Sequence, residues 1–127
     1  AGGGAVAKTA ISIAQTKMAI PSIEAFLRGI LCNVLVCLAV WLCFAAHTVS
    51  GKILSIVFPI SAFVALGFEH SVANMYLIPV GYLAGAAGVS IDGFIANLIP
   101  VTLGNIAGGG VLVALIYWIV YLRKPEQ

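Results

Sequence analysis

The feature that most constrains this chain is how rarely charge interrupts it. Four stretches contain no Asp, Glu, Lys or Arg: residues 29–51, 53–68, 71–91 and 93–122. A helix needs about 20 apolar residues to cross a hydrocarbon core about 30 Å thick. The strands of a membrane β-barrel would instead alternate apolar and polar residues over about 10 positions, and these stretches do not alternate. The pattern predicts an all-α integral membrane protein.

Composition excludes most classes of soluble protein. Apolar residues make up 62% of the 127 residues and charged residues only 8%, whereas a soluble domain has about 25% charged residues. Six Lys and Arg against four Asp and Glu are too few for a phosphate-binding surface, so we expect no nucleic-acid partner. Three cysteines without a CxxC spacing predict no zinc site and no disulfide framework. The expected partner is the lipid bilayer, with no metal or cofactor.

The charge-free stretches divide the chain into four segments. We expect a helix end followed by a loop, one full membrane helix, one long broken membrane helix and a last membrane helix, over residues 1–20, 21–46, 53–84 and 93–122. The opening has no Met and lacks the basic and apolar regions of a signal peptide. We therefore expect that the chain is a portion of a longer protein.

The distribution of basic residues predicts the orientation of the chain. Lys52 lies in one connecting turn, and Arg123 and Lys124 follow the last helix. By parity these residues share one side of the membrane, and the positive-inside rule places that side in the cytoplasm. The C-terminus is therefore expected to be cytoplasmic, although Lys8 and Lys17 fall on the opposite side.

Two ionisable residues, Glu69 and His70, stand near the middle of the apolar stretch 53–84. A charged group near the bilayer centre costs about 2.5–3.5 kcal/mol on insertion scales and is a functional candidate by default. A helix broken at this point would free backbone groups, and the positive N-terminal ends of half-helices would favour an anion. The alternative is a single kinked helix in which Glu69 and His70 pair with each other.

Small residues recur at a spacing of four at Gly81 and Gly85 and at Gly104 and Gly108. In lipid such spacings let helix backbones approach closely, because packing drives helix association there. We expect tight helix packing at both places.

His70 leaves two chemical roles open. An imidazole titrates near neutral pH and could exchange a proton, or it could ligate a haem or a metal. His47, the second histidine, lies in a polar turn at a membrane edge, which disfavours ligation of one haem by both histidines. The competing functions are a transport pore, a membrane anchor subunit of a redox enzyme that binds haem or quinone, and a purely structural membrane protein.

Three segments resemble one family. Residues 67–75 (GFEHSVANM) resemble the GFEHSxANM signature of the formate/nitrite transporter family. Residues 97–106 (NLIPVTLGNI) are similar to its NLIPVTxGNxxGG segment, and residues 33–41 (NVLVCLAVW) to its N-x-LVCLAVW helix. These segments are long, and the resemblance extends over nearly the whole chain.

The resemblance implies an aquaporin-like helical bundle in a cell's inner membrane. It implies a homopentamer of six-helix protomers, each with a pore for small monovalent anions such as formate, nitrite or hydrosulfide, and in some members coupled to protons. The chain resembles the second half of such a protomer, helices four to six with a broken fifth helix. The N-terminal half, with a pore-facing threonine, has no counterpart in the chain.

The resemblance also implies roles for individual residues. His70 matches the central pore histidine, and Lys17, 53 positions upstream, matches a pore-facing lysine. Phe63 matches a hydrophobic constriction and Asn33 a polar position in or beside the pore. We expect the lysine and the half-helix ends to attract an anion, the constriction to strip its water, and the histidine to offer a hydrogen bond or a proton.

Two further residues of the resembling signature are Glu69 and Asn74. We expect both to support the break in the helix rather than to contact the anion.

Overall fold

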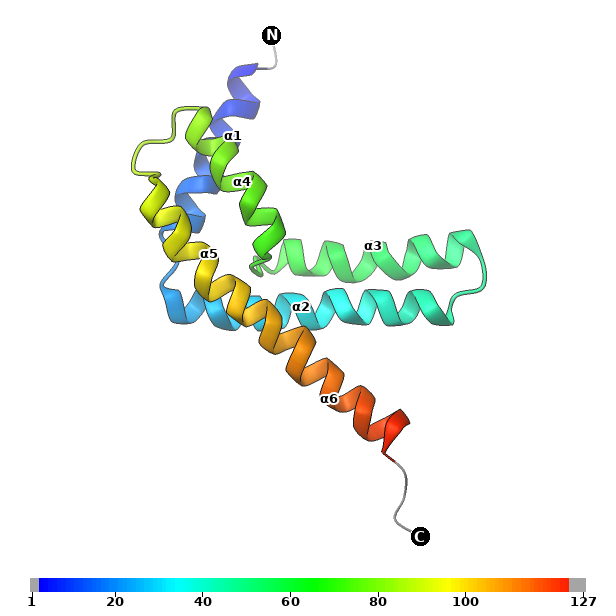
Figure 1. Ribbon diagram of the computed structural model, residues 1–127. Coiled ribbons are helices and arrows are strands. Elements are labelled where there is room, and N and C mark those ends of the chain that lie inside the picture. The colour runs from blue at the N-terminus through cyan, green and yellow to red at the C-terminus, as the bar shows by residue number, and fades with distance from the viewer. Residues whose placement is uncertain (1–2, 124–127) are drawn as a thin grey trace.

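The computed structural model describes residues 3–123, which contain helices and no β-strand. The prediction of an all-α chain is therefore confirmed for this part of the chain (Figure 1). In order, its elements are α1 (Gly3–Met18), α2 (Ser22–Ala45), α3 (Val49–Ala65), α4 (Ser71–Leu83), α5 (Ile91–Ile106), η1 (Ala107–Val113), α6 (Ala114–Tyr117) and η2 (Trp118–Leu122). Lys124, which contributed to the predicted orientation, lies outside the described residues.

The helices α2 and α3 form an antiparallel hairpin joined by a short turn (Figure 1). Pro21 precedes α2, and Glu24 lies in its first turn. An acidic side chain there is stabilised by the positive N-terminal end of the helix. The hydroxyl of Thr48 accepts a hydrogen bond from the Gly51 N–H at 3.0 Å and caps α3. Because of this cap α3 begins at Val49, inside the segment that the sequence suggested was a turn.

Residues 3–18 form the helix α1, whereas the sequence suggested a helix end followed by a loop. The loop is confined to residues 19–21. The helix packs against α4, where a Cβ placed on Gly81 would lie 2.2 Å from the Ala14 Cβ. This contact is in the middle of α1, and packing of this kind supplies most of the stability of a helix in a protein.

The last helix is continuous from Ile91 to Leu122, a length of 32 residues. It includes two π-helical segments, η1 and η2, in which the helix is wider but unbroken. Ser90 caps its start by accepting from the Gly93 N–H at 3.1 Å. This cap places the start two residues before the predicted one. The helix crosses α2 and ends beyond it (Figure 1).

The glycines spaced four residues apart in the last helix, Gly104 and Gly108, pack tightly against α2, as predicted. A Cβ on Gly104 would lie 2.2 Å from the Phe26 carbonyl oxygen, and one on Gly108 would lie 2.3 Å from the Ile30 carbonyl oxygen. The two backbones therefore approach so closely that only glycine fits. Gly85 differs, because no atom lies within 4 Å of its Cβ position and its φ of 93° ends α4 instead.

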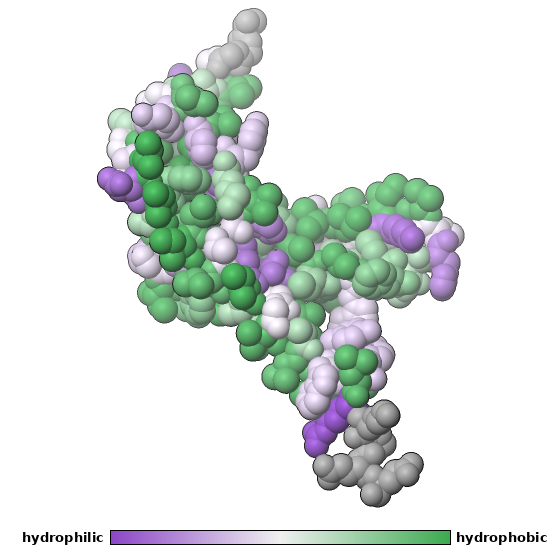
Figure 2. Space-filling view, viewed as in Figure 1, coloured by the Kyte–Doolittle hydropathy of each residue, from purple (hydrophilic) through white to green (hydrophobic). Residues whose placement is uncertain are grey.

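The longest helices leave most of their apolar surface uncovered. Both α2 and residues 91–122 are long and apolar enough to cross a membrane, and only 17% of the most apolar window of each is buried. A core helix of a soluble protein would be mostly buried. Hydrophobic residues accordingly dominate the face seen in Figure 2, as expected of helices that face lipid or further helices.

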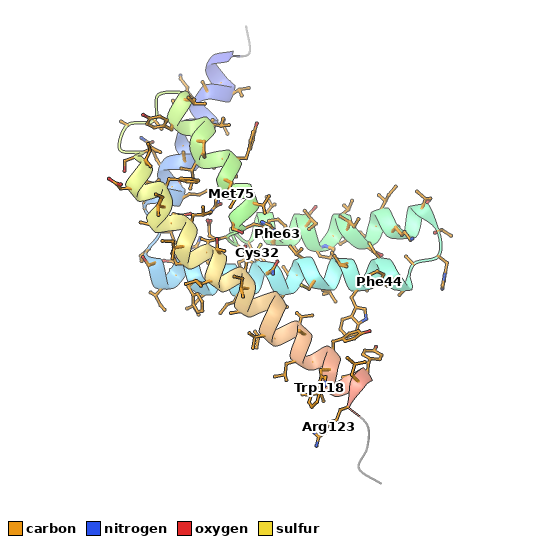
Figure 3. The ribbon with its side chains drawn as sticks, in the orientation of Figure 1. Cys32, Phe44, Phe63, Met75, Trp118 and Arg123 are labelled. Atoms are coloured by element: carbon orange, nitrogen blue, oxygen red, sulfur yellow. The ribbon has the colours of Figure 1, made fainter. Side chains whose placement is uncertain are left out.

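An aromatic cluster joins α2 to the end of the last helix. The Trp41 ring packs edge-on against Tyr117 and Tyr121, with centroid distances of 6.0 and 5.8 Å. Trp118 and Arg123 lie close by at the end of the same helix (Figure 3). Aromatic residues beside a basic residue are typical of the boundary between lipid and water.

Candidate functional site

The chain breaks its helix between α3 and α4, at residues 66–70, where the sequence predicted a break. The N–H of Phe68 donates to the Phe63 carbonyl at 3.0 Å, and the N–H of Gly67 donates to the Val64 carbonyl at 3.1 Å. This pair of bonds is the Schellman motif, which needs a left-handed residue after the helix. Gly67 supplies it with a φ of 67°, and α4 then leaves in a different direction (Figure 1).

His70 caps the second half of the broken helix. Its Nδ1 accepts a hydrogen bond from the Val72 N–H at 3.2 Å, and its backbone is extended. Because Nδ1 accepts, a neutral imidazole carries its proton on Nε2. Nε2 is thereby left as a donor. The alternative in which Glu69 and His70 pair within one kinked helix is not what the structure shows, since each has other partners.

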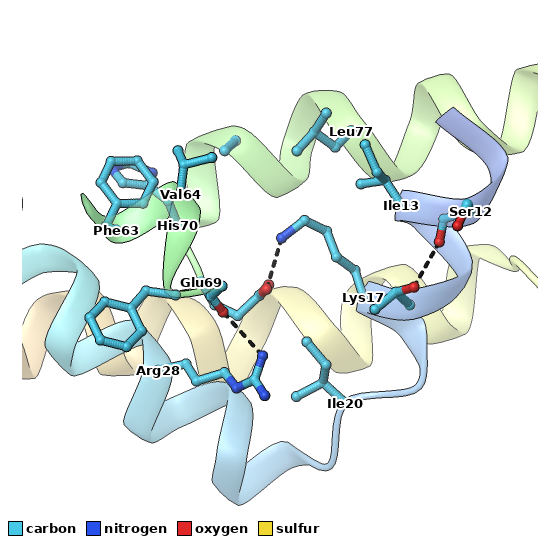
Figure 4. A pocket seen from close by; sticks show the side chains of 14 residues that line it. Ser12, Ile13, Lys17, Ile20, Arg28, Phe63, Val64, Glu69, His70 and Leu77 are labelled. Atoms are coloured by element: carbon cyan, nitrogen blue, oxygen red, sulfur yellow. Dashed lines mark hydrogen bonds and ion pairs between the residues drawn. The ribbon is translucent and has the colours of Figure 1, made fainter. Parts of the chain in front are cut away.

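The break borders a cavity of about 390 Å³. Its walls come from α1, α2, α3, the break itself and α4, and its lining is mostly apolar. The residues that line it are Ser12, Ile13, Thr16, Lys17, Ile20, Arg28, Phe63, Val64, Gly67, Phe68, Glu69, His70, Ala73 and Leu77. Four of the six residues singled out from the sequence therefore meet in this cavity: Lys17, Phe63, Glu69 and His70 (Figure 4).

Lys17 and Glu69 form an ion pair across the cavity wall. Lys17 Nζ donates to Glu69 Oε1 at 2.8 Å, and the two side chains are 14% and 3% exposed (Figure 4). A pair this well buried is close to electrically neutral as a unit, and each charge depends on the other. Phe63 lies beside His70 on the other side of the break, with a distance of 5.9 Å between ring centroids.

Two buried asparagines connect the Glu69 side chain to the neighbouring helices. Asn74 Nδ2 donates to Glu69 Oε2 at 2.6 Å and to Asn97 Oδ1 at 2.9 Å. Asn97 Nδ2 in turn donates to the Lys17 carbonyl at 2.9 Å. This chain of bonds holds the ion pair against α4 and α5.

Asn105 bonds the break from the opposite side. Its Nδ2 donates to the carbonyls of Glu69 at 3.0 Å and Gly29 at 2.9 Å. Its Oδ1 accepts from the backbone N–H of Ser71 at 2.9 Å and from the Ser71 hydroxyl at 3.0 Å. Asn105 thus connects α2, the break and α4 within a low-dielectric interior, where unsatisfied groups are costly.

Sequence reasoning did not assign roles to Asn97, Asn105 or Arg28. Both asparagines lie in the family-like segment 97–106. Two amide side chains eight residues apart in an apolar helix were the sequence signal that could have indicated buried hydrogen bonds. Two predicted site residues lie outside the cavity lining, Asn74 and Asn33. Asn33 Nδ2 donates to the Asn105 carbonyl at 2.6 Å, so Asn33 joins α2 to the last helix.

The dipoles at the break differ from the sequence-based expectation of converging N-terminal ends. In the described part of the chain, α4 presents its N-terminus here but α3 presents its C-terminus. One end is positive and the other negative. The expectation failed because a break in one helix always joins a C-terminus to an N-terminus.

Comparison with known proteins agrees with this architecture. The family model described as "Formate/nitrite transporter" matches residues 1–119. A "Probable formate transporter" of Methanothermobacter thermautotrophicus is 57% identical over 101 residues, which cover 80% of this chain and 36% of that protein. "Formate channel FocA" of Escherichia coli (strain K12) is 44% identical over 123 residues, with coverage of 83% and 43%.

A solved structure described as "Pentameric formate channel with formate bound" superimposes with a TM-score of 0.85 at 40% identity. The alignment covers 95% of this chain and 55% of that one. This chain thus spans between 36% and 55% of the length of these relatives. The sequence and the three-dimensional arrangement of its helices agree, and this chain belongs to the formate/nitrite transporter family of membrane proteins.

Proposed function

We propose that this chain forms one half of the protomer of a homopentameric channel for small monovalent anions. The observation that carries the proposal is the cavity at the helix break, where Lys17, Phe63 and His70 meet in mostly apolar surroundings. The relatives described as formate channels and transporters support formate as a substrate. Nitrite and hydrosulfide share its charge and small size.

In this proposal the chain supplies helices four to six of a six-helix, aquaporin-like protomer. The fourth helix is α2, the broken fifth is α3 with α4, and the sixth is residues 91–122. A further N-terminal half supplies the facing wall of the pore. The protein lies in the inner membrane with its C-terminus in the cytoplasm, as the basic residues near Lys52 and Arg123 suggest.

Passage of the anion depends on charge and dehydration. The Lys17–Glu69 ion pair places a polar group in the cavity wall, and the Phe63 ring forms part of a dry constriction. A lone charge is costly to bury in apolar surroundings, so a small weak acid crosses more readily when neutral. A group that donates a hydrogen bond or a proton at this point lowers that cost.

His70 is that group. Because its Nδ1 caps α4, its Nε2–H is free to donate to an anion in the cavity. Protonating Nδ1 would remove the cap, and losing an N-cap costs about 1 kcal/mol. Hydrogen bonding therefore needs no rearrangement, whereas proton uptake is coupled to the start of α4.

The alternative of a membrane anchor that binds haem or quinone receives no support from the formate channels and transporters that this chain matches. An absorption spectrum of the purified protein tests it, because bound haem would give a Soret band.

The first experiment measures formate flux into proteoliposomes. The chain alone is expected to give no flux, since it supplies one wall of the pore. Co-expression with an N-terminal half, for which the preceding part of the Escherichia coli formate channel can serve, should restore flux. Equal flux from the chain alone would contradict the two-half arrangement. Absence of flux from an assembled pentamer that contains both halves would contradict the proposed function itself.

Two variants of His70 then separate its roles in the two-half pentamer. His70→Asn keeps a hydrogen-bonding group and an N-cap but cannot titrate, so anion flux should persist without its pH dependence. His70→Phe keeps only a ring and should lose most flux. If the pH dependence of the wild-type protein persists in an assembled His70→Asn pentamer, His70 is not the proton-linked group.

A further inference from the structure

The negative end of α3 presents a problem for a site that attracts anions. Its last carbonyls face the break that borders the cavity, and the end of a helix there carries about half a negative charge. Lys17 does little to offset it, because its charge is already matched by Glu69 at 2.8 Å. A further positive group is needed if the break is to favour an anion.

Arg28, on α2, is placed to supply that group. Its Nη1 donates to the carbonyl of Gly67, the residue after α3, at 3.1 Å. Its side chain also lines the cavity (Figure 4). A guanidinium at this carbonyl lies beside the C-terminal end of α3, where its positive charge opposes the negative end of the helix dipole.

Glu24 moderates the charge of Arg28. It lies one helical turn earlier on α2, and its Oε1 accepts from Arg28 Nη2. The carboxylate does not line the cavity, whereas the guanidinium does. The pair therefore presents its positive member to the cavity.

We infer that Arg28 is a positioning residue for anion entry, and that Glu24 sets how much of its charge the cavity experiences. Arg28 neutralises the C-terminal end of α3 and holds the Gly67 carbonyl, so that the positive start of α4 dominates the break. The inference rests on the proposed function, since it concerns the same cavity.

The charges that face the cavity predict opposite effects for the two partners. With Lys17 and Glu69 matched and His70 neutral, Arg28 and Glu24 control the balance. Removing the Arg28 charge leaves the end of α3 exposed to an anion. Removing the Glu24 charge leaves the guanidinium unopposed while its bond to Gly67 remains. A purely structural ion pair would respond in the same direction to the loss of either partner.

The test uses the two-half pentamer in proteoliposomes and measures the formate concentration that gives half-maximal flux, with the maximal flux as a second readout. Arg28→Gln should raise the half-maximal concentration about two- to fivefold, the range expected for one charge at a helix end. Glu24→Gln should lower it. Arg28→Lys keeps the charge but loses the forked geometry, and should lie between wild type and Arg28→Gln.

Lys52→Gln is the matched control, because it removes one positive charge from an exposed position in the first turn of α3. It should leave the half-maximal concentration unchanged. A shift of Arg28→Gln and Glu24→Gln in the same direction, or an unchanged half-maximal concentration in Arg28→Gln, overturns the inference and leaves the proposed function standing. Loss of assembly in Arg28→Gln is resolved by Glu24→Gln, which retains the bond to Gly67 and must still lower the half-maximal concentration.

Discussion

Residues 66–70 and residues 107–113 both place glycine inside long apolar helical sequence, yet the chain treats them differently. At residues 66–70 the helix ends and restarts, with Gly67 at a φ of 67°. At residues 107–113 three glycines remain helical in a π-helical segment, and the helix continues to Leu122. Glycine alone therefore does not break a helix in this protein.

The two regions differ in what surrounds the backbone. At the break, side chains satisfy the freed groups: Arg28 binds the Gly67 carbonyl, Asn105 the Glu69 carbonyl, and His70 the Val72 N–H. At residues 107–113 the backbone bonds continue, and a neighbouring helix fills the space beside Gly108. A break in apolar surroundings requires partners for every freed group, whereas glycines without such partners are used for close packing.

The largest effect should come from the ion pair beside the break. Lys17→Met leaves the Glu69 carboxylate buried without its cation, which costs about 3–5 kcal/mol for a buried pair. We expect the unfolding temperature of the assembled protein in detergent to fall sharply. The double variant Lys17→Met/Glu69→Gln should recover much of the loss, because no unpaired charge remains.

The half-exposed pair of Arg28 and Glu24 provides the comparison for that prediction. Glu24→Gln should cost no more than about 0.5 kcal/mol, the usual size of an exposed pair four residues apart. If Lys17→Met and Glu24→Gln lowered the unfolding temperature equally, the buried ion pair would not stabilise the break more than the pair on α2 does.

The next effect concerns the continuous glycine region. Gly108→Ala would place a Cβ 2.3 Å from the Ile30 carbonyl oxygen, and because backbone must move we expect a loss of about 3 kcal/mol. At Gly110 the nearest atom to a Cβ would be 3.9 Å away, so Gly110→Ala should be neutral or stabilising. The unfolding temperatures of the two variants check this, and equal losses would contradict the close-packing explanation.

A smaller effect is expected at the break itself. Gly67→Ala meets no crowded atom, since Arg28 Nη1 would lie 3.6 Å from its Cβ. Its cost is the left-handed backbone alone, about 1–2 kcal/mol. Gly67→Asn should lose less, because asparagine tolerates this conformation better. If Gly67→Ala proved more harmful than Gly108→Ala, backbone conformation rather than packing would dominate.

The smallest effect should come from the cap of α4. His70→Leu removes the Nδ1 acceptor of the Val72 N–H and should cost about 1 kcal/mol. His70→Asn supplies an alternative cap and should retain most of the stability. Thermal unfolding of the two variants separates them, and identical unfolding temperatures would show that the cap adds no stability.

Much of the fold could be predicted from local sequence, because charge and apolar length act locally. The sequence predicted the first full helix over residues 21–46, and α2 runs from Ser22 to Ala45. Glu69 and His70 at the middle of an apolar stretch indicated the break. The residues that lie within the break, or directly beside it, were therefore accessible to reasoning from order along the chain.

The rest depended on contacts between distant residues. The partner of Glu69 is Lys17, 52 positions away, and Asn105 reaches Gly29 across 76 positions. Such pairs leave no periodic signal, since any buried amide or cation could satisfy the same group. The hydrogen bond from Asn33 to the Asn105 carbonyl likewise joins residues 72 positions apart.

The sequence by itself determined that the chain is helical, apolar and interrupted at Gly67 to His70, because hydrophobicity and turn chemistry are properties of neighbouring residues. Only the tertiary structure decided which residues meet at the interruption. It brought Lys17 and Arg28 to the cavity beside the break and gave Gly108 its neighbour on α2. The physical reason is that burial makes each freed polar group require a partner, and only the packing of the helices determines which partner is within reach.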